Sequence, residues 1–125
     1  MIAIDASAML AYLFREPGHE QVKPHLTNGC MSTVNVSEVL ARFARDGHAT
    51  DALSNAMKAS GIEFVAFAEA HAVLAAQWVP ATRRLGLSIG DRACLALARE
   101  RGIPALTADR IWLDADVGVN VKLIR

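Results

Sequence analysis

The chain has 125 residues, of which 53% are apolar, and its thirteen basic residues balance thirteen acidic ones. This length and composition exclude a disordered chain and suit one compact domain with a single core. Zero net charge excludes a general electrostatic attraction to nucleic acid, so any such contact needs a local basic patch.

Nothing in the chain predicts export or a membrane span. The apolar stretch AHAVLAAQWVPA is too short and too interrupted to cross a bilayer, and Met1 leads directly into a predicted strand without the features of a signal peptide. Cys30 and Cys94 lie far apart in apolar surroundings, without the spacing of a metal site or redox pair. We therefore expect a cytoplasmic protein, without membrane contacts, that has two buried and reduced thiols.

The first half of the chain alternates apolar strands with helices. The residues MIAID have the pattern of a buried strand, and a helical pattern follows until Pro17 and Gly18 interrupt it. The clearest helix begins near residue 34, where apolar residues recur at helical spacing, and Gly47 ends it. We expect strands at 1–5 and 30–33, and helices at 6–14, 19–27, 34–47 and 50–61.

The second half continues this pattern and ends in a strand. The segment IPALTAD is apolar and, like the first strand, ends on an aspartate. Strands that alternate with helices of about 10–15 residues form parallel sheets covered by helices on both faces. The predicted fold class is therefore α/β, in a single domain over residues 1–125. We expect strands at 62–67, 103–109 and 119–125, and helices at 68–79 and 88–102.

Four carboxylates fall where such a sheet binds ligands. Asp5 and Asp109 end two predicted strands, and the carboxyl ends of parallel strands form the ligand edge of the sheet. Glu38 lies in the first turns of the helix after the second strand, at the same edge. Asp91 also lies in a first helical turn, but it follows a helical stretch, so its place at this edge depends on helix packing.

Each carboxylate also has a structural explanation. Asp5 could cap the helix that follows it, and Glu38 could form an exposed i,i+4 ion pair with Arg42. Ser88 and Asp91 fit the pattern of a capping box. The aspartate that ends IPALTAD could likewise cap a short turn over RIWLD.

Convergence of the four acids would favour a chemical explanation. Grouped carboxylates repel one another unless a cation neutralises them. Oxygen ligands without histidine or cysteine suit Mg²⁺ or Mn²⁺ and not Zn²⁺. Ions of this kind activate water and stabilise the charge on a phosphodiester during in-line attack. The set of acids therefore predicts a metal-dependent nuclease.

The motifs that carry these acids occur in the order IDAS, NVSEV, GDR and TAD. With the run LSIGDRACLALA followed by GIPALTADRIW, the chain resembles the PIN domain and, more narrowly, the VapC toxins of type II toxin–antitoxin pairs. The resemblance covers essentially the whole chain, including the last strand VNVKLIR. The single motifs are unspecific, whereas the ordered set is much more specific.

The resemblance implies a flavodoxin-like or Rossmann-like parallel sheet and a Mg²⁺-dependent endoribonuclease, with Mn²⁺ as the other candidate ion. In this family four acids hold the metal, and a metal-activated water cleaves the RNA backbone. Matched motif by motif, the catalytic and metal-binding residues are Asp5, Glu38, Asp91 and Asp109. Ser7 and Thr107 match supporting hydroxyl residues, and hydrogen bonding within the core explains them equally well. We expect Asp114 to be a solvated turn residue.

The resemblance also implies partners. VapC toxins are usually homodimers that a small VapB-like antitoxin silences, and the complex commonly binds its own promoter DNA through the antitoxin. Candidate residues for an apolar antitoxin groove, which could equally be core residues, are Leu10, Leu13, Leu53 and Met57. The candidate RNA contacts are Arg42, Arg92 and Arg110, with Arg83 and Arg84 in addition.

Two other function classes fit the sequence less well. A phosphatase of the haloacid dehalogenase type needs a second aspartate where this chain has Ser7, and a response-regulator receiver needs an early acidic pair and a late lysine that are missing. A catalytically silent PIN-like module that binds RNA or protein is the remaining alternative. The four histidines are scattered along the chain and indicate no general base.

Overall fold

Five short strands form one parallel sheet in the computed structural model, which describes residues 1–125. They are β1 (Ile2–Ile4), β2 (Gly29–Ser32), β3 (Glu63–Val65), β4 (Ala105–Thr107) and β5 (Val121–Leu123). Their order is β3-β2-β1-β4-β5, and every neighbouring pair is parallel. The central strand β1 therefore has β2 on one side and β4 on the other, which creates a switch point in the strand order beside β1.

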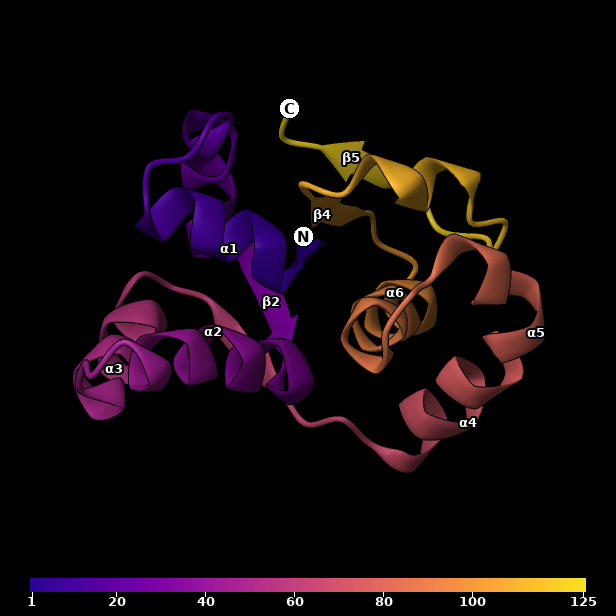
Figure 1. The fold of residues 1–125 in the computed structure, drawn as a ribbon, viewed down its shortest axis with the longest axis horizontal. Helices are drawn as coiled ribbons and strands as arrows, with labels where there is room; N and C mark the ends of the chain where they lie inside the picture. Colours follow the sequence, from indigo (N-terminus) through magenta and orange to yellow (C-terminus); the bar gives the residue numbers. More distant parts are fainter.

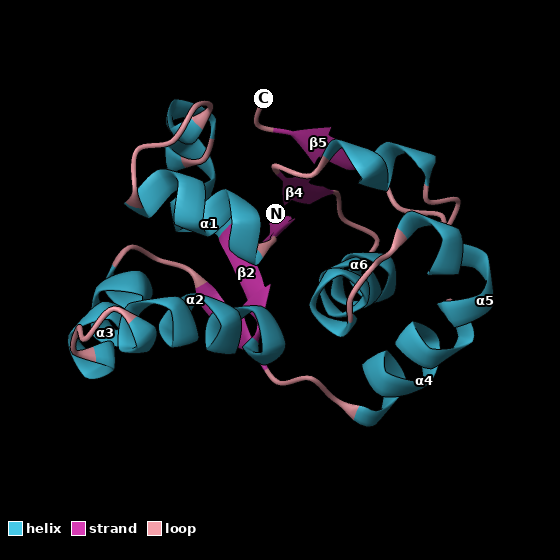
Figure 2. Ribbon diagram, viewed as in Figure 1, coloured by secondary structure: helices cyan, strands magenta, loops and turns pink.

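Helices cover both faces of this sheet, as predicted. Figures 1 and 2 show α1, α2 and α3 on one side of the strands and α4, α5 and α6 on the other. No helix combines the length and the apolar character that a bilayer span requires. The α-helices are α1 (Ala6–Leu13), α2 (Thr33–Arg45), α3 (Thr50–Ala59), α4 (Glu69–Gln77), α5 (Val79–Thr82) and α6 (Ile89–Arg101). Short 3₁₀ helices are η1 (His19–Gln21), η2 (Lys23–Asn28), η3 (Arg83–Leu85) and η4 (Arg110–Asp114).

The strands supply side chains to two hydrophobic cores, one on each face. Ile2 and Ile4 of β1 belong to the core under α1, α2 and α3, whereas Ala3 between them belongs to the core under α6. In β4, Leu106 and Ala105 divide in the same way. This alternation follows from the two-residue period of a strand and explains why the strand sequences are continuously apolar.

The second core contains both thiols. Cys30 and Cys94 are free and buried, as the sequence predicts, and they pack with the fully buried Trp112. Burial raises the pKa of both thiols, which keeps them protonated and chemically quiet at neutral pH.

The element boundaries differ from the prediction in three places. The predicted helix over 19–27 is a pair of 3₁₀ helices, because Gly18 enters it in a left-handed conformation and Pro24 lacks an N–H group. The predicted helix over 68–79 ends at Gln77, and Pro80 lies in the first turn of α5. The strands are shorter than predicted, so Asp109 lies in the loop beyond β4 and not in the strand.

Candidate functional site

Asp5 lies at the switch point, at the carboxyl end of β1, and is only 3% exposed. It occupies the N-cap position of α1, but its side chain makes no capping hydrogen bond. Its Oδ2 atom instead accepts hydrogen bonds from Ser7 Oγ at 2.6 Å and from Thr107 Oγ1 at 2.9 Å. The capping explanation for this carboxylate is therefore wrong, because its hydrogen bonds go to hydroxyl groups.

The two hydroxyl groups connect the start of α1 with the end of β4. Ser7 Oγ and Thr107 Oγ1 lie 3.1 Å apart, and each also accepts a backbone N–H from the loop after β4. Ala108 N donates to Ser7 Oγ at 3.0 Å, and Asp109 N donates to Thr107 Oγ1 at 3.1 Å. Ser7 and Thr107 thus fix both the carboxylate of Asp5 and the start of the loop that carries Asp109.

Asp109 is exposed at the N-cap of η4. Its Oδ1 atom accepts a hydrogen bond from Ile111 N at 3.1 Å, so the sequence-based explanation as the cap of a short turn is confirmed. This bond leaves the second carboxylate oxygen without a hydrogen bond in the protein. Asp114, the last residue of η4, is exposed, as expected for a solvated turn residue.

Glu38 lies near the start of α2 and does not pair with Arg42. The Nε atom of Arg42 instead lies 3.5 Å from Asp46 Oδ2, and its guanidinium group covers the ring of Phe14 at 4.7 Å. Glu38 Oε2 accepts a hydrogen bond from Asn35 Nδ2 at 3.1 Å. The proposed ion pair within α2 is therefore not formed, and the carboxylate of Glu38 is free of cationic partners.

Asn35 and Gly90 complete the surroundings of Glu38, and the sequence analysis did not identify either. Asn35 is fully buried, and its Nδ2 atom also donates to the carbonyl oxygen of Gly90 at 2.9 Å. A Cβ atom at Gly90 would overlap the carboxyl group of Glu38. The spacing of three residues between Asn35 and Glu38 places both on one helix face, a signal that could have identified Asn35. Nothing local distinguishes Gly90, because its neighbour comes from another helix.

Asp91 lies next to Gly90 in the first turn of α6. The predicted capping box is present: Ser88 N donates to Asp91 Oδ2 at 2.8 Å, and Asp91 N donates to Ser88 Oγ at 3.2 Å. Because α6 packs against α2 and β1, this turn also lies beside Glu38. Packing therefore places Asp91 at the carboxyl edge of the sheet, where the sequence had left its position open.

The four carboxylates share one electrostatic environment. The pKa of Asp5 is raised to about 6, chiefly by burial and to a smaller extent by the charges of Asp91 and Glu38. Burial also raises the pKa of Glu38, and the nearby charge of Asp91 adds to this effect. Burial likewise raises the pKa of Asp91, with a further contribution from the charge of Asp109. Raised pKa values at neighbouring acids are typical of a site that favours a cation.

The carboxylates suit a hard divalent cation by their chemistry, although no three of them are arranged to hold one directly. Glu38, Asp91 and Asp109 accept hydrogen bonds from donors nearby in the sequence, whereas Asp5 also accepts one from Thr107 on β4. Only one oxygen of each carboxylate accepts hydrogen bonds. The other oxygen of each carboxylate has no hydrogen-bond donor in the protein. Mg²⁺ keeps several of its waters and needs only a few carboxylates, so the donor set fits this ion.

Three of the five candidate RNA-binding arginines have partners within the chain, whereas Arg83 and Arg84 in η3 are exposed and make no hydrogen bond or ion pair. Arg92 Nη1 donates to the carbonyl of Ala75 at 2.8 Å, and Arg110 Nη1 donates to the carbonyl of Arg125 at 3.1 Å. Arg42 covers Phe14, as described above. Each of the three side chains therefore has a structural role, and an RNA contact would compete with it.

The candidate apolar groove is present in part. A cavity of about 200 Å³ lies between α1 and α3, and Leu13, Leu53 and Met57 line it. The alternative that these are core residues also holds, because Met57 belongs to the core under α1 and Leu10, Leu13 and Leu53 pack against it. His71, the histidine inside the apolar α4, is buried and lies 2.7 Å from Glu100 Oε1, which gives it a structural role away from the carboxylates.

Comparison with known proteins agrees with this architecture. A family model for the PIN domain matches residues 2–118, nearly the whole chain. No curated protein sequence matches the chain.

Several solved structures have the same fold. A toxin–antitoxin complex from Klebsiella pneumoniae is similar with a TM-score of 0.77 and 14% identity, over 100% of this chain and 98% of that one. The DNA-bound VapBC complex from Salmonella typhimurium gives a TM-score of 0.74 and 14% identity, over 99% of this chain and 98% of that one. The sarcin–ricin loop cleaving toxin VapC20 from Mycobacterium tuberculosis gives a TM-score of 0.74 and 18% identity, over 96% of this chain and 99% of that one.

Proposed function

The chain belongs to the PIN-domain family, and on this premise we propose that it is a metal-dependent endoribonuclease that acts as the toxin of a toxin–antitoxin pair. One similar structure is a toxin that cleaves an RNA loop, and others are toxin–antitoxin complexes, which supports the proposal. The single observation that carries it is the group of four carboxylates at the switch point, without a basic side chain paired to any of them.

In this proposal Asp5, Glu38, Asp91 and Asp109 hold Mg²⁺, with Mn²⁺ as the alternative. The bound ion would supply Lewis-acid activation of water and neutralise charge at the scissile phosphodiester. Ser7 and Thr107 hold the carboxylate of Asp5 in place through its Oδ2 atom, so that Oδ1 stays available. Asn35 holds the carboxylate of Glu38 in place by donating to its Oε2 atom. No side chain of the chain acts as a nucleophile in this scheme.

The proposal extends to partners and location. An antitoxin segment would occupy the apolar groove between α1 and α3, which Leu13, Leu53 and Met57 line. The family membership supports a VapB-like antitoxin as the partner, with promoter DNA bound through that antitoxin. It also supports a homodimeric toxin in the cytoplasm.

Cleavage of total cellular RNA by the purified protein, free of partner proteins, tests the activity. We expect discrete fragments with Mg²⁺, and no cleavage with EDTA or in the Asp5→Asn variant. Asp51→Asn is the matched control, because Asp51 is an exposed acid on α3 away from the carboxylates, and it should cleave normally.

Two outcomes would contradict the proposal. Cleavage that persists in Asp5→Asn would indicate a contaminating nuclease or a different site. A folded protein that binds Mg²⁺ in calorimetry but cleaves no RNA would favour the catalytically silent binding module.

A further inference from the structure

A cationic pocket lies at the far end of α1 from the carboxylates. Its volume is about 350 Å³, and the residues that line it are Tyr12, Leu13, Arg15, His19 and Lys23. Asp5 precedes α1, and Tyr12 follows seven residues later, which corresponds to about 10 Å along a helix axis. The pocket is therefore separate from the carboxylate group and close enough for one extended ligand to reach both.

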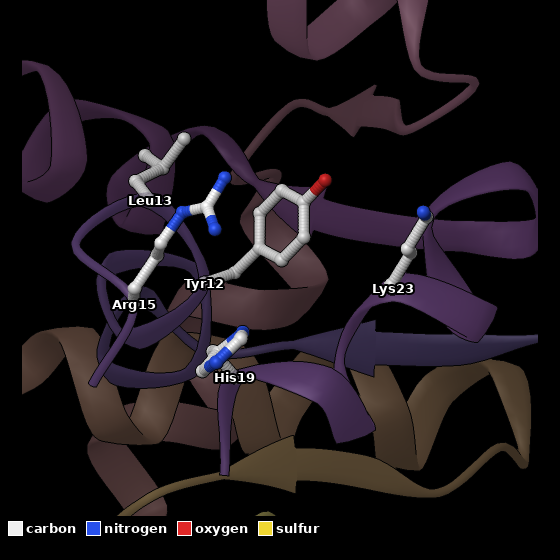
Figure 3. A pocket seen from close by; sticks show the side chains of 5 residues that line it. All are labelled: Tyr12, Leu13, Arg15, His19 and Lys23. Atoms are coloured by element: carbon white, nitrogen blue, oxygen red, sulfur yellow. The ribbon is translucent and has the colours of Figure 1, made fainter. Parts of the chain in front are cut away.

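The pocket is lined by donors and by no carboxylate. Figure 3 shows Arg15 and Lys23 on either side of the Tyr12 ring, with the guanidinium, hydroxyl and ammonium groups directed to the same side. Neither Arg15 nor Lys23 takes part in an ion pair. Of the lining residues, His19 is the one with an acidic partner, since its Nε2 atom lies 3.4 Å from Glu20 Oε2. Two unpaired cations beside a phenol ring favour an anionic ligand.

The backbone at Arg15 supports a role for this side chain. Arg15 is the only residue other than glycine with a positive φ, at 54°. Glu16 N donates to the carbonyl of Ala11 at 2.8 Å, so the chain leaves α1 through a left-handed residue, where glycine is strongly favoured. Arginine is unfavourable at a left-handed position, where glycine is the usual residue. Residues that oppose the local backbone preference in this way are typical of functional positions.

We infer that this pocket is an RNA exosite, which binds phosphates of a single strand outside the cleavage point. Arg15 and Lys23 contact successive backbone phosphates, and the Tyr12 ring between them offers a stacking surface for a base. A chain with zero net charge needs local basic patches to bind RNA. Arg42, Arg92 and Arg110 are engaged within the protein, whereas Arg83 and Arg84 in η3 are exposed at another place on the surface. The inference rests on the proposed ribonuclease function, because it names where part of that substrate binds.

The test measures binding without cleavage. Fluorescence anisotropy with a labelled single-stranded RNA oligonucleotide is recorded in an Asp5→Asn background at several salt concentrations. The pocket variant combines Arg15→Gly, which keeps the left-handed backbone, with Lys23→Ala. The control combines Arg45→Ala with Lys58→Ala, which removes the same charge at exposed positions on α2 and α3. Circular dichroism verifies that both variants are folded.

We expect the pocket variant to bind RNA at least tenfold more weakly and the control to change less than twofold. The slope of log affinity against log salt should fall by about 1.4 in the pocket variant, since each single-strand phosphate contributes about 0.7. Tyr12→Phe, which keeps the ring, should bind nearly normally, whereas Tyr12→Ala should not. Equal losses in the pocket variant and the control would overturn the inference, because they would show a general charge effect.

Other outcomes separate this inference from the proposed function. RNA cleavage by the native protein with unchanged binding in the pocket variant would overturn the exosite and leave the ribonuclease intact. Salt-dependent binding that needs the pocket, in a protein that cleaves nothing, would support the exosite and contradict the ribonuclease. Unchanged RNA affinity with lost binding of an oligo-glutamate peptide would assign the pocket to an acidic protein segment and overturn the inference.

Discussion

The carboxyl group of Glu38 lies directly against Gly90, at the point where a side chain on residue 90 would begin. The contact joins α2 to the first turn of α6, and Asn35 reinforces it by donating to both residues. Glycine at position 90 therefore lets the carboxylate of Glu38 approach the helix start that carries Asp91.

Gly90→Ala should displace the Glu38 carboxylate. We expect RNA cleavage to fall at least tenfold, because the new Cβ atom takes the space of the Glu38 carboxyl group. The free energy of unfolding should change by less than about 1 kcal/mol, because only the flexible end of Glu38 has to move and alanine favours a helix over glycine. Urea denaturation and the cleavage assay measure the two effects. Unchanged cleavage would show that the contact with Glu38 does not position its carboxylate.

Asn35→Ala should destabilise the junction of α2 and α6. The substitution removes a buried hydrogen bond to the carbonyl of Gly90 and a half-buried one to Glu38 Oε2, for which we expect a loss of about 1–3 kcal/mol in the free energy of unfolding. Asn55→Ala, at an exposed position on α3, is the control and should change stability by less than about 0.5 kcal/mol. Equal effects of the two substitutions would contradict a structural role of Asn35.

Asp5→Asn should stabilise the metal-free protein at neutral pH. Burial raises the pKa of Asp5 from 3.8 to about 6, so between these values the folded protein binds more protons than the unfolded chain, and stability falls as pH rises. The corresponding penalty above pH 6 is about 3 kcal/mol at most. Thermal unfolding in EDTA should therefore give a higher Tm for the variant at pH 7.5 and a difference that vanishes near pH 4. A Tm difference independent of pH would show that the charge is not its cause.

Thr107→Val should weaken the support of Asp5 while keeping the shape of the side chain. The substitution removes the donor to Asp5 Oδ2 and the acceptor for Asp109 N, so we expect a loss of about 1–3 kcal/mol in stability and a lower cleavage rate. Thr107→Ser retains the hydroxyl group and should restore cleavage, measured side by side at saturating RNA. Similar cleavage by the valine and serine variants would exclude a positioning role for the hydroxyl.

The sequence by itself determined the order and type of the main elements. Apolar periodicity and the glycine and proline signals depend on neighbours within about one helical turn, so they are visible without a fold. The location of Asp5 and Asp109 near the carboxyl ends of two strands was predictable for the same reason, although both strands end before the aspartate. The capping box of Ser88 and Asp91 is also local, since its two residues are three positions apart.

Only the tertiary structure decided which partner each functional side chain has. Asp5 had a local option as a helix cap, but the hydroxyl groups of Ser7 and of Thr107, the latter 102 positions away, hold its carboxylate instead. Asn35 meets Gly90 across 55 positions, and this contact exists only because α2 packs against α6. Such contacts depend on how the helices pack on the two faces of the sheet, and a periodic pattern specifies which face of a helix is buried but not which residue it meets.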